Sequence, residues 1–397
     1  MPQLDYHTAG ESHGPALISL VQGVPAGVEI DVDLMNTEMR RRQGGYGRGG
    51  RQRIETDTVE FLSGVRLGRA IGSPIAIRIA NKDSRLDDLE RTPPVHRPRP
   101  GHADLAGSIK WLTNDCRETL ERASARETAA RVAAGSLAKC ILKHVGIEVF
   151  GFVRSIRDVE SPVEVTEGNY RDLIAARDAS EVYTLDPESS EAMCARIREA
   201  KVEKDTAGGI VEAHVFHCPI GLGSSTDGRL RLDAKIAYAV MGIQAFKGVE
   251  IGLGMECARR PGSEVHDPIA FDASKKDTPS LGYVRPSNNA GGLEGGMTNG
   301  MPVVVKGAMK PISTLLRGLP SVNLRTTQPE HSDYERSDVC AVSAASVVME
   351  NAVAFEIARA LLEKFPGDSV TELESAYDAY LRAARTLPDL DEGVAIA

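Results

Sequence analysis

Apolar and polar residues alternate with a period of two in several stretches of the chain, and this pattern predicts antiparallel strands. Residues 16–25 read ALISLVQGVP, and residues 58–80 alternate around glycine turns. The same reasoning predicts strands at 147–156, at 248–258 and from residue 303 onward.

Helical spacing of apolar residues predicts helices between these strands, at 31–39, 121–144, 233–246 and 336–365. The polar segment 157–205 also has helical patterns but contains no recognisable chemistry. Sheet and helix therefore mix along the chain. The length of 397 residues allows two or three domains, or one large fold.

The segment 97–135 is the most unusual part of the pattern. It begins with RPRPGHAD, in which two prolines stiffen a loop that presents His102 between Arg99 and Asp104. It continues with ERASARETAARVAAG, a helix rich in alanine that can pack very close to its neighbours.

Several polar residues share one face of this predicted helix. Arg122 and Arg126 are one turn apart, and Ser124, Glu127 and Arg131 follow at helical spacing. An ordinary core helix leaves such a face apolar, so the pattern indicates a binding site.

Composition places the chain among globular proteins, with 42% hydrophobic and 26% charged residues. An aromatic content of 5% argues against a stacking surface for single-stranded nucleic acid. The N-terminus lacks an apolar signal region, and no run approaches the ~18 apolar residues of a membrane helix. We expect a soluble, cytoplasmic protein.

The metal-binding residue types do not form a recognisable site. The six cysteines are scattered without a Cys-x-x-Cys pair, which predicts reduced thiols. His214 and His217 point to opposite faces if they lie in a strand, so they should not share a metal ion. We expect no metal.

Residues 40–53, RRRQGGYGRGGRQR, carry six arginines and five glycines in a chain whose net charge is −9. The tract could bind nucleic acid, but an acidic protein is a poor polyanion binder. We favour a flexible arginine lid over a small polyanion, held by guanidinium forks. The tract also matches G-x-G-x-x-G, but it follows a helical pattern and so fails as a dinucleotide site.

Three residues are candidates for acid and base chemistry: His13 in TAGESHG, His102, and Asp338 in RSDVCAV. His13 could instead be a structural histidine, and Ser337 or Asp338 could simply cap a helix. The candidate anion-binding residues are Arg42, Arg48, Arg51, Arg99, Arg126 and Arg336. So many arginines indicate a small substrate with several negative charges.

Two further segments have ligand-binding features. The loop 288–302 contains five glycines and is either mobile or able to bring backbone amides near a ligand. Lys310, Ser313 and Thr314 stand at the end of the next predicted strand, where they could bind phosphate.

Seven sequence blocks, in order, resemble the chorismate synthase family: GESHG at 10–14, RPGHAD at 99–104, ERASARETAARVAAG at 121–135, MGIQAFKGVEIG at 241–252, AGGLEGGMTNG at 290–300, KPIST at 310–314 and RSDVCAV at 336–342. The resemblance implies a lyase of the shikimate pathway that makes chorismate from 5-enolpyruvylshikimate 3-phosphate. The reaction is a 1,4-anti elimination of phosphate that requires reduced FMN without net redox change.

The resemblance also implies residue roles. His13 would protonate the departing phosphate, His102 would protonate reduced flavin near N1, and Asp338 would assist proton removal from flavin N5. The family's flavin positions match Arg122, Ala123, Ser124, Gln244, Ala245, Gly295, Lys310, Pro311, Ile312, Ser313, Thr314 and Arg336. Arg42 and Arg48 match positions assigned to NADPH contact, although substrate phosphate suits their charge equally well.

The fold implied by the resemblance is an α+β, single-domain β-α-β sandwich, with helices between two antiparallel sheets, in a homotetramer. Residues 1–397 would form that domain, with a flexible tail from 386. The alternatives are a flavin- or phosphate-binding regulatory protein without catalysis, and an RNA-binding protein that uses the arginine-glycine tract.

Overall fold

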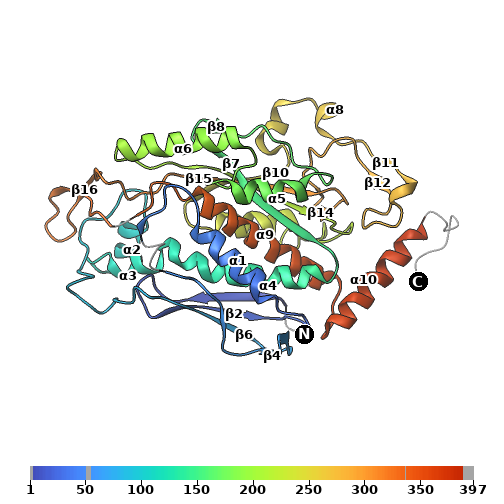
Figure 1. Cartoon of the computed structure of the whole chain (residues 1–397), viewed down its shortest axis with the longest axis horizontal. Helices are drawn as coiled ribbons and strands as arrows, with labels where there is room; N and C mark the ends of the chain where they lie inside the picture. The colour runs from blue at the N-terminus through green and yellow to red at the C-terminus, as the bar shows by residue number, and fades with distance from the viewer. Residues whose placement is uncertain (1–2, 51–54, 336, 388–397) are drawn as a thin grey trace.

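The computed structural model describes residues 3–50, 55–335 and 337–387, in which two antiparallel sheets enclose a layer of helices (Figure 1). The first sheet has the order β1-β2-β6-β3. Its strands are β1 (Asp5–Ala9), β2 (Ala16–Gln22), β3 (Glu60–Phe61) and β6 (Ile75–Ala80). Alternate residues of β6, beginning with Ile75, are buried, as the period of two predicts.

The second sheet has the order β10-β15-β9-β7-β8. Its strands are β7 (Glu148–Ile156), β8 (Val159–Glu160), β9 (Gly209–Phe216), β10 (Phe246–Ile251) and β15 (Val303–Met309). An aromatic cluster of Phe150, Phe152, Tyr170 and Phe216 joins β7 and β9 to α5 (Tyr170–Ala179). The helix α6 (Pro187–Val202) contacts β7 and β8, and its buried Met193 and Ile197 belong to the main core.

Helices α1 (Val32–Gln43), α4 (Thr128–Lys143) and α9 (Val342–Lys364) fill the space between the sheets (Figure 1). The helix α4 packs on β2 and β6, and α9 packs on β7 and β9. Where α4 crosses α9, a Cβ at Gly135 would lie 2.3 Å from the backbone oxygen of Asn351. The alanine-rich sequence therefore serves close helix packing, as predicted.

Buried charges join these three helices. Arg41 contacts Glu38 at 2.6 Å and Glu350 at 2.9 Å, and Lys139 contacts the same two carboxylates at 2.9 and 2.6 Å. Each buried charge thus has an opposite charge beside it, as a buried ion requires.

The other elements lie around the two sheets and in the connections. They are β4 (Val65–Arg66), β5 (Arg69–Ala70), α2 (Asp104–Lys110), α3 (Arg117–Arg122), η2 (Ala125–Glu127), α7 (Leu232–Met241), η3 (Gly254–Arg259), α8 (Gly262–Val265), β11 (Ala270–Phe271), η4 (Ala273–Lys275), β12 (Tyr283–Val284), β13 (Leu293–Glu294), β14 (Met297–Thr298), β16 (Pro320–Val322), β17 (Pro329–His331) and α10 (Val370–Arg385).

The predicted mixed α+β fold is confirmed, and most predicted strands and helices are present. Four boundaries were wrong. The first helix extends to Gln43, the helix predicted from residue 233 ends at Met241, the strand predicted at 248–258 ends at Ile251, and the last long helix begins only at Val342. Strand β1 was not predicted.

The six cysteines are all unpaired thiols. Within the described ranges, no helix has the length and apolar character needed to cross a membrane. Most of the predicted flexible tail, residues 388–397, lies outside the described residues.

Candidate active site

A cavity of about 420 Å³ lies where the helical layer meets the loops at one end of the sheets. Of the predicted site residues, those that line it are His13, Arg42, Arg48, Arg99, His102, Ala123, Ser124, Arg126, Gln244, Ala245, Lys310, Ile312, Ser313, Thr314 and Asp338. Arg122, Gly295 and Pro311 are not among the lining residues. Arg51 and Arg336 lie outside the described residues.

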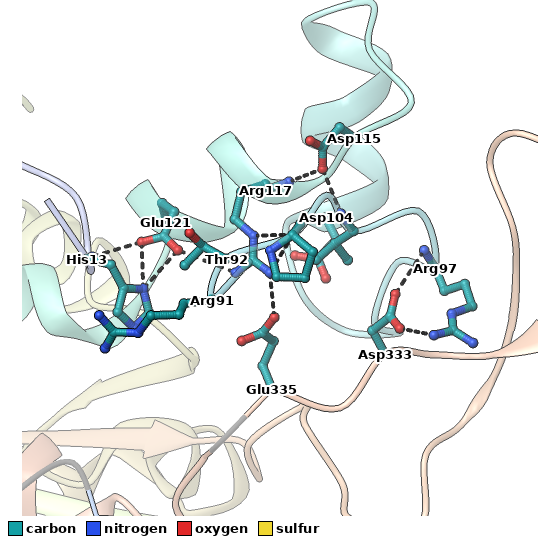
Figure 2. Close-up of polar contacts among 12 residues, drawn as sticks. His13, Arg91, Thr92, Arg97, Asp104, Asp115, Arg117, Glu121, Asp333 and Glu335 are labelled. Atoms are coloured by element: carbon teal, nitrogen blue, oxygen red, sulfur yellow. Dashed lines mark hydrogen bonds and ion pairs between the residues drawn. The ribbon is translucent and has the colours of Figure 1, made fainter. Parts of the chain in front are cut away.

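His13 lies in the turn between β1 and β2, with 7% of its surface exposed. Its Nδ1 is 2.9 and 3.0 Å from the two carboxylate oxygens of Glu121 (Figure 2). Its Nε2 is 3.2 Å from Arg85 Nη2. The imidazole is therefore held by a buried carboxylate on one side and meets a lining arginine on the other.

His102 belongs to the loop before α2, and it too is held by a carboxylate. Its Nδ1 contacts Asp104 and lies 3.0 Å from Arg99 Nη2, while Arg99 Nε is 2.8 Å from Asp104. Burial alone would raise the pKa of Asp104, but hydrogen bonds from His102 and Arg99 hold it well below its ordinary value. Asp104 is therefore a carboxylate at neutral pH.

Asp338 does not cap α9, because the N-cap position is Ala341. Its Oδ1 instead accepts a 2.6 Å hydrogen bond from the backbone N–H of Gly49, and its Oδ2 is 3.2 Å from Arg48 Nε. The residue thus joins the start of the α9 segment to the arginine-glycine tract.

Arg42 and Arg126 meet at one shared carboxylate. Asp57 Oδ2 lies 2.6 Å from Arg42 Nη2 and 2.7 Å from Arg126 Nη1. Burial and the positive charges of Arg126 and Arg48 together lower the pKa of Arg42 to about 10, although Asp57 raises it. Positive charge is therefore crowded at this wall of the cavity.

The arginine-glycine tract is only partly a loop. Its first arginines form the last turn of α1, where basic residues are favourable, and Arg41, Arg42 and Arg48 are largely buried beside carboxylates. A fully flexible lid over 40–53 is thus wrong for the helical part, and residues 51–54 lie outside the described ranges.

The predicted continuous helix at 121–144 is broken where it reaches the cavity. The helix α3 ends at Arg122, and the Ser124 side chain accepts a hydrogen bond from the backbone N–H of Arg126 to begin η2. The break separates two arginines that were expected to share a face. Arg126 lines the cavity, whereas Arg122 donates to the backbone oxygens of Thr8 and Gly10.

The strand end after β15 supplies polar groups to the cavity, as predicted. Thr314 Oγ1 accepts a 2.9 Å hydrogen bond from Arg99 Nη1. Burial, with a smaller contribution from Lys247, lowers the pKa of Lys310. An anion beside Lys310 would offset both effects.

His214 and His217 have separate partners. His214 Nε2 is 2.6 Å from Glu212, whereas His217 Nδ1 is 3.2 Å from Glu167. Across the described part of the chain, no three His, Cys, Asp or Glu side chains are grouped closely enough to hold a metal ion.

Sequence reasoning missed the residues that hold the predicted ones, namely Asp57, Asn81, Arg85 and Glu121. Glu121 stands inside the ERASAR block, so the sequence alone places it next to the polar residues of the predicted helix. Asp57 and Arg85 lie in unremarkable connections, and no local pattern distinguishes them from surface residues.

The family model described as chorismate synthase matches residues 4–362. The chain belongs to the chorismate synthase family. It is 50% identical to the chorismate synthase of Geobacter metallireducens, over 96% of this chain and 100% of that one. It is also 50% identical to that of Thermoanaerobacter pseudethanolicus, over 95% and 98%.

A solved crystal structure of chorismate synthase superposes with a TM-score of 0.79 at 39% identity, covering 98% of this chain and 100% of that chain. The enzyme is a shikimate-pathway lyase that converts 5-enolpyruvylshikimate 3-phosphate to chorismate and phosphate, and the chemistry of this family depends on a reduced flavin.

The cavity fits a flavin as well as an anionic substrate. Ala123, Ala341, Ala344 and Ala345 give part of the wall little side-chain bulk, so a flat ring could lie close to the helices. Gln244 also lines the cavity, and its Oε1 is buried without a hydrogen-bond partner among the described residues. Such an acceptor suits a polar ring edge, because a buried amide oxygen requires a donor.

Proposed function

We propose that the arginine-rich wall of this cavity binds the two carboxylates and the phosphate of 5-enolpyruvylshikimate 3-phosphate. The observation that carries the proposal is the cluster in which Arg42 and Arg126 share Asp57 while Arg48 lies close enough to lower the pKa of Arg42 further. A bound anion would stabilise these closely spaced guanidinium groups further, and guanidinium groups bind carboxylate and phosphate in a bidentate way.

His13 is the proton donor to the departing phosphate in this proposal. Its Nδ1 is engaged by Glu121, so Nε2 is the nitrogen that delivers the proton to the phosphate oxygen as the C–O bond breaks. Arg85 lies 3.2 Å from that nitrogen and can hold the same phosphate. A positioned acid typically accelerates such a step by ~10² to 10⁴.

His102 and Asp338 act on the flavin side of the cavity, and Ala123, Ser124, Gln244, Ala245 and the segment from Lys310 to Thr314 would hold the flavin. When bound, reduced FMN would supply the redox-active group that the elimination requires, although the overall reaction involves no net redox change. His102 holds a proton that balances the charge of the reduced ring, and the Asp338 carboxylate accepts a proton. Asp104 and Arg48 keep these two side chains in place.

An anaerobic assay with the substrate tests the proposal as a whole. We expect chorismate absorbance and phosphate release in equal amounts with reduced FMN, and neither with oxidised FMN alone. Adding dithionite should restore turnover. Turnover under air with strictly oxidised FMN would overturn the assignment of the cofactor. Adding NADPH to the anaerobic enzyme with oxidised FMN, and following bleaching of the flavin, tests whether NADPH is the direct reductant.

We propose in addition that residues 1–397 form a single domain, that the enzyme works in the cytoplasm, and that it assembles as a homotetramer. The homotetramer is the assembly that the resemblance to the chorismate synthase family implies. Light scattering of the purified enzyme would give the mass of the assembly, and a monomer at all concentrations would contradict it.

A further inference from the structure

Glu121 is buried against His13 and contacts it in two ways. Only 1% of the residue is exposed, and its carboxylate oxygens lie 2.9 and 3.0 Å from His13 Nδ1. One of them also accepts a 2.9 Å hydrogen bond from the backbone N–H of His13. The carboxylate therefore fixes both the imidazole ring and the backbone that carries it (Figure 2).

Arg117 holds Glu121 from the other side. Its Nη1 lies 3.5 Å from Glu121 Oε1, and its Nη2 lies 2.9 Å from Glu335, a residue that lines the cavity. Arg117 also donates from Nε and Nη2 to the backbone oxygen of Pro93. Figure 2 shows Arg117 between the two carboxylates, with Glu121 next to His13.

The groups around Glu121 favour its carboxylate form. Burial alone would raise the pKa of Glu121, but the hydrogen bonds from His13 and the charge of Arg117 lower it. On the other side of the ring, Arg85 Nη2 lies 3.2 Å and Asp83 Oδ2 lies 3.9 Å from Nε2.

We propose that Glu121 is a positioning residue for His13, which it holds with a proton on Nδ1 so that Nε2 exchanges the catalytic proton. The inference rests on the proposed role of His13 as the donor to phosphate. In the step, the Nε2–H bond breaks and an O–H bond forms on the leaving phosphate. The imidazole becomes neutral and retains its Nδ1 proton. Glu121 stays ionised throughout, because Arg117 balances its charge.

The variant Glu121→Gln tests this role, and Glu118→Gln is its matched control. Glu118 lies in the same helix, α3, but is exposed, so its substitution makes the same chemical change away from His13. We expect Glu121→Gln to lower kcat by about 10 to 100-fold, less than the ~10² to 10⁴ of losing the acid itself, because His13 remains in place. KM for the substrate should change by less than about threefold, and Glu118→Gln should behave as wild type.

The pH profile separates positioning from a structural role. Without the carboxylate, a protonated imidazole would lose its charged partner, so the alkaline fall of kcat should move to lower pH. Glu121→Asp keeps the charge and should recover part of both kcat and the profile. A profile of wild-type shape in Glu121→Gln, with kcat merely scaled down, would overturn the inference.

A double-mutant cycle with His13→Asn distinguishes failure of the inference from failure of the proposed function. If Glu121 acts through His13, Glu121→Gln should have no more than about a twofold effect in the His13→Asn background. An undiminished effect there would refute the positioning role. A wild-type kcat in His13→Asn alone would instead refute the proposed acid.

Nitrogen NMR of the histidine rings in the ligand-free enzyme gives a readout that needs no turnover. The His13 signals, identified by their loss in His13→Asn, should show a protonated Nδ1 in the wild type. They should change in Glu121→Gln and not in Glu118→Gln. An unprotonated Nδ1 in the neutral ring of the wild-type enzyme would overturn the inference even if Glu121→Gln did not fold.

Discussion

Asp338 and Gly49 are joined by a 2.6 Å hydrogen bond across 289 positions of the sequence, and the same carboxylate lies 3.2 Å from Arg48 Nε. The arginine proposed to bind substrate is thus held by the residue proposed to accept a proton. Arg48 Nη1 is buried without a hydrogen-bond partner among the described residues. A substrate anion could therefore bind Arg48 without displacing Asp338.

This arrangement predicts opposite effects of two substitutions. Asp338→Asn removes a negative charge beside Arg48, so KM should stay the same or fall while kcat drops at least about tenfold. Arg48→Ala should raise KM about tenfold or more, because a charge-assisted hydrogen bond contributes ~1.5 to 3 kcal/mol. Steady-state kinetics with reduced FMN would measure both.

The exposed Arg40→Ala, in the same helix as Arg42, is the control for loss of positive charge and should leave both constants unchanged. If Asp338→Asn instead raises KM as Arg48→Ala does, Asp338 contributes to binding and its proposed proton transfer is wrong.

The close crossing of α4 and α9 predicts a strong effect of Gly135→Ala. A Cβ there would lie 2.3 Å from the backbone oxygen of Asn351 and 2.5 Å from its Cβ, so the two helices would have to separate. Overpacking of a core typically costs ~1 to 3 kcal/mol, and a backbone clash belongs at the upper end. Gly228→Ala has no atom within 4 Å of the added Cβ and is the control. Thermal unfolding of both variants would test this, and equal melting temperatures would contradict the packing.

Glu212 predicts part of the acid sensitivity of the fold. Burial alone would raise its pKa, but His214 and Arg154 lower it from 4.5 to about 2. Because the pKa is lower in the folded state, this stabilisation is complete above about pH 4.5 and is lost as the pH falls toward 2. A shift of this size corresponds to about 3 kcal/mol.

Glu212→Gln should therefore lower the free energy of unfolding at pH 7 by about 3 to 5 kcal/mol, since it leaves Arg154 buried without its carboxylate. The variant should also lose less stability than the wild type between pH 4.5 and about 3. Urea unfolding at both pH values would measure this. The exposed Glu199→Gln, in an ion pair with Arg196, should shift the free energy by less than about 0.5 kcal/mol. Parallel acid curves for wild type and Glu212→Gln would contradict the role of Glu212.

The alternation in 58–80 and the alanines of 121–135 were sufficient to predict strands and close helix packing, because both follow from local periodicity. The break at Ser124 could not be predicted in this way. Its flanking residues have good helix propensity, and the chain leaves the helix because the Ser124 side chain caps the next turn. The same holds for Asp338, which resembles a helix cap locally but whose partner, Gly49, is distant in the sequence.

The residues of the candidate site also fall into those that could be predicted from the sequence and those that could not. His13, His102 and Asp338 could be named from residue type and from family resemblance, and all three line one cavity. Two carboxylates of the site were not named: Glu121, which holds His13, and Asp57, which holds Arg42 and Arg126. Asp57 has no distinguishing local pattern, and the ERASAR block that contains Glu121 does not indicate which residue it contacts. Both carboxylates become recognisable only when the fold brings each one against a buried cation or imidazole.

The last prediction compares His13 with His102. Each histidine contacts a buried carboxylate, but the two have different proposed roles. His13 should act on the substrate phosphate, so His13→Ala should lower kcat by ~10² to 10⁴ and leave the spectrum and affinity of bound reduced FMN nearly unchanged. His102 is held by Asp104 and Arg99 on the loop before α2, and its proton should balance the charge of the reduced ring. His102→Ala should therefore lower kcat and also shift the spectrum of bound reduced FMN toward that of the neutral reduced form, because the ring anion loses the positive charge that balanced it. Anaerobic difference spectra between about pH 6 and 9, where a histidine titrates, would be recorded beside single-turnover rates for both variants. Spectra of His102→Ala that match the wild type at every pH would remove His102 from the cofactor and leave it as a residue that shapes the loop.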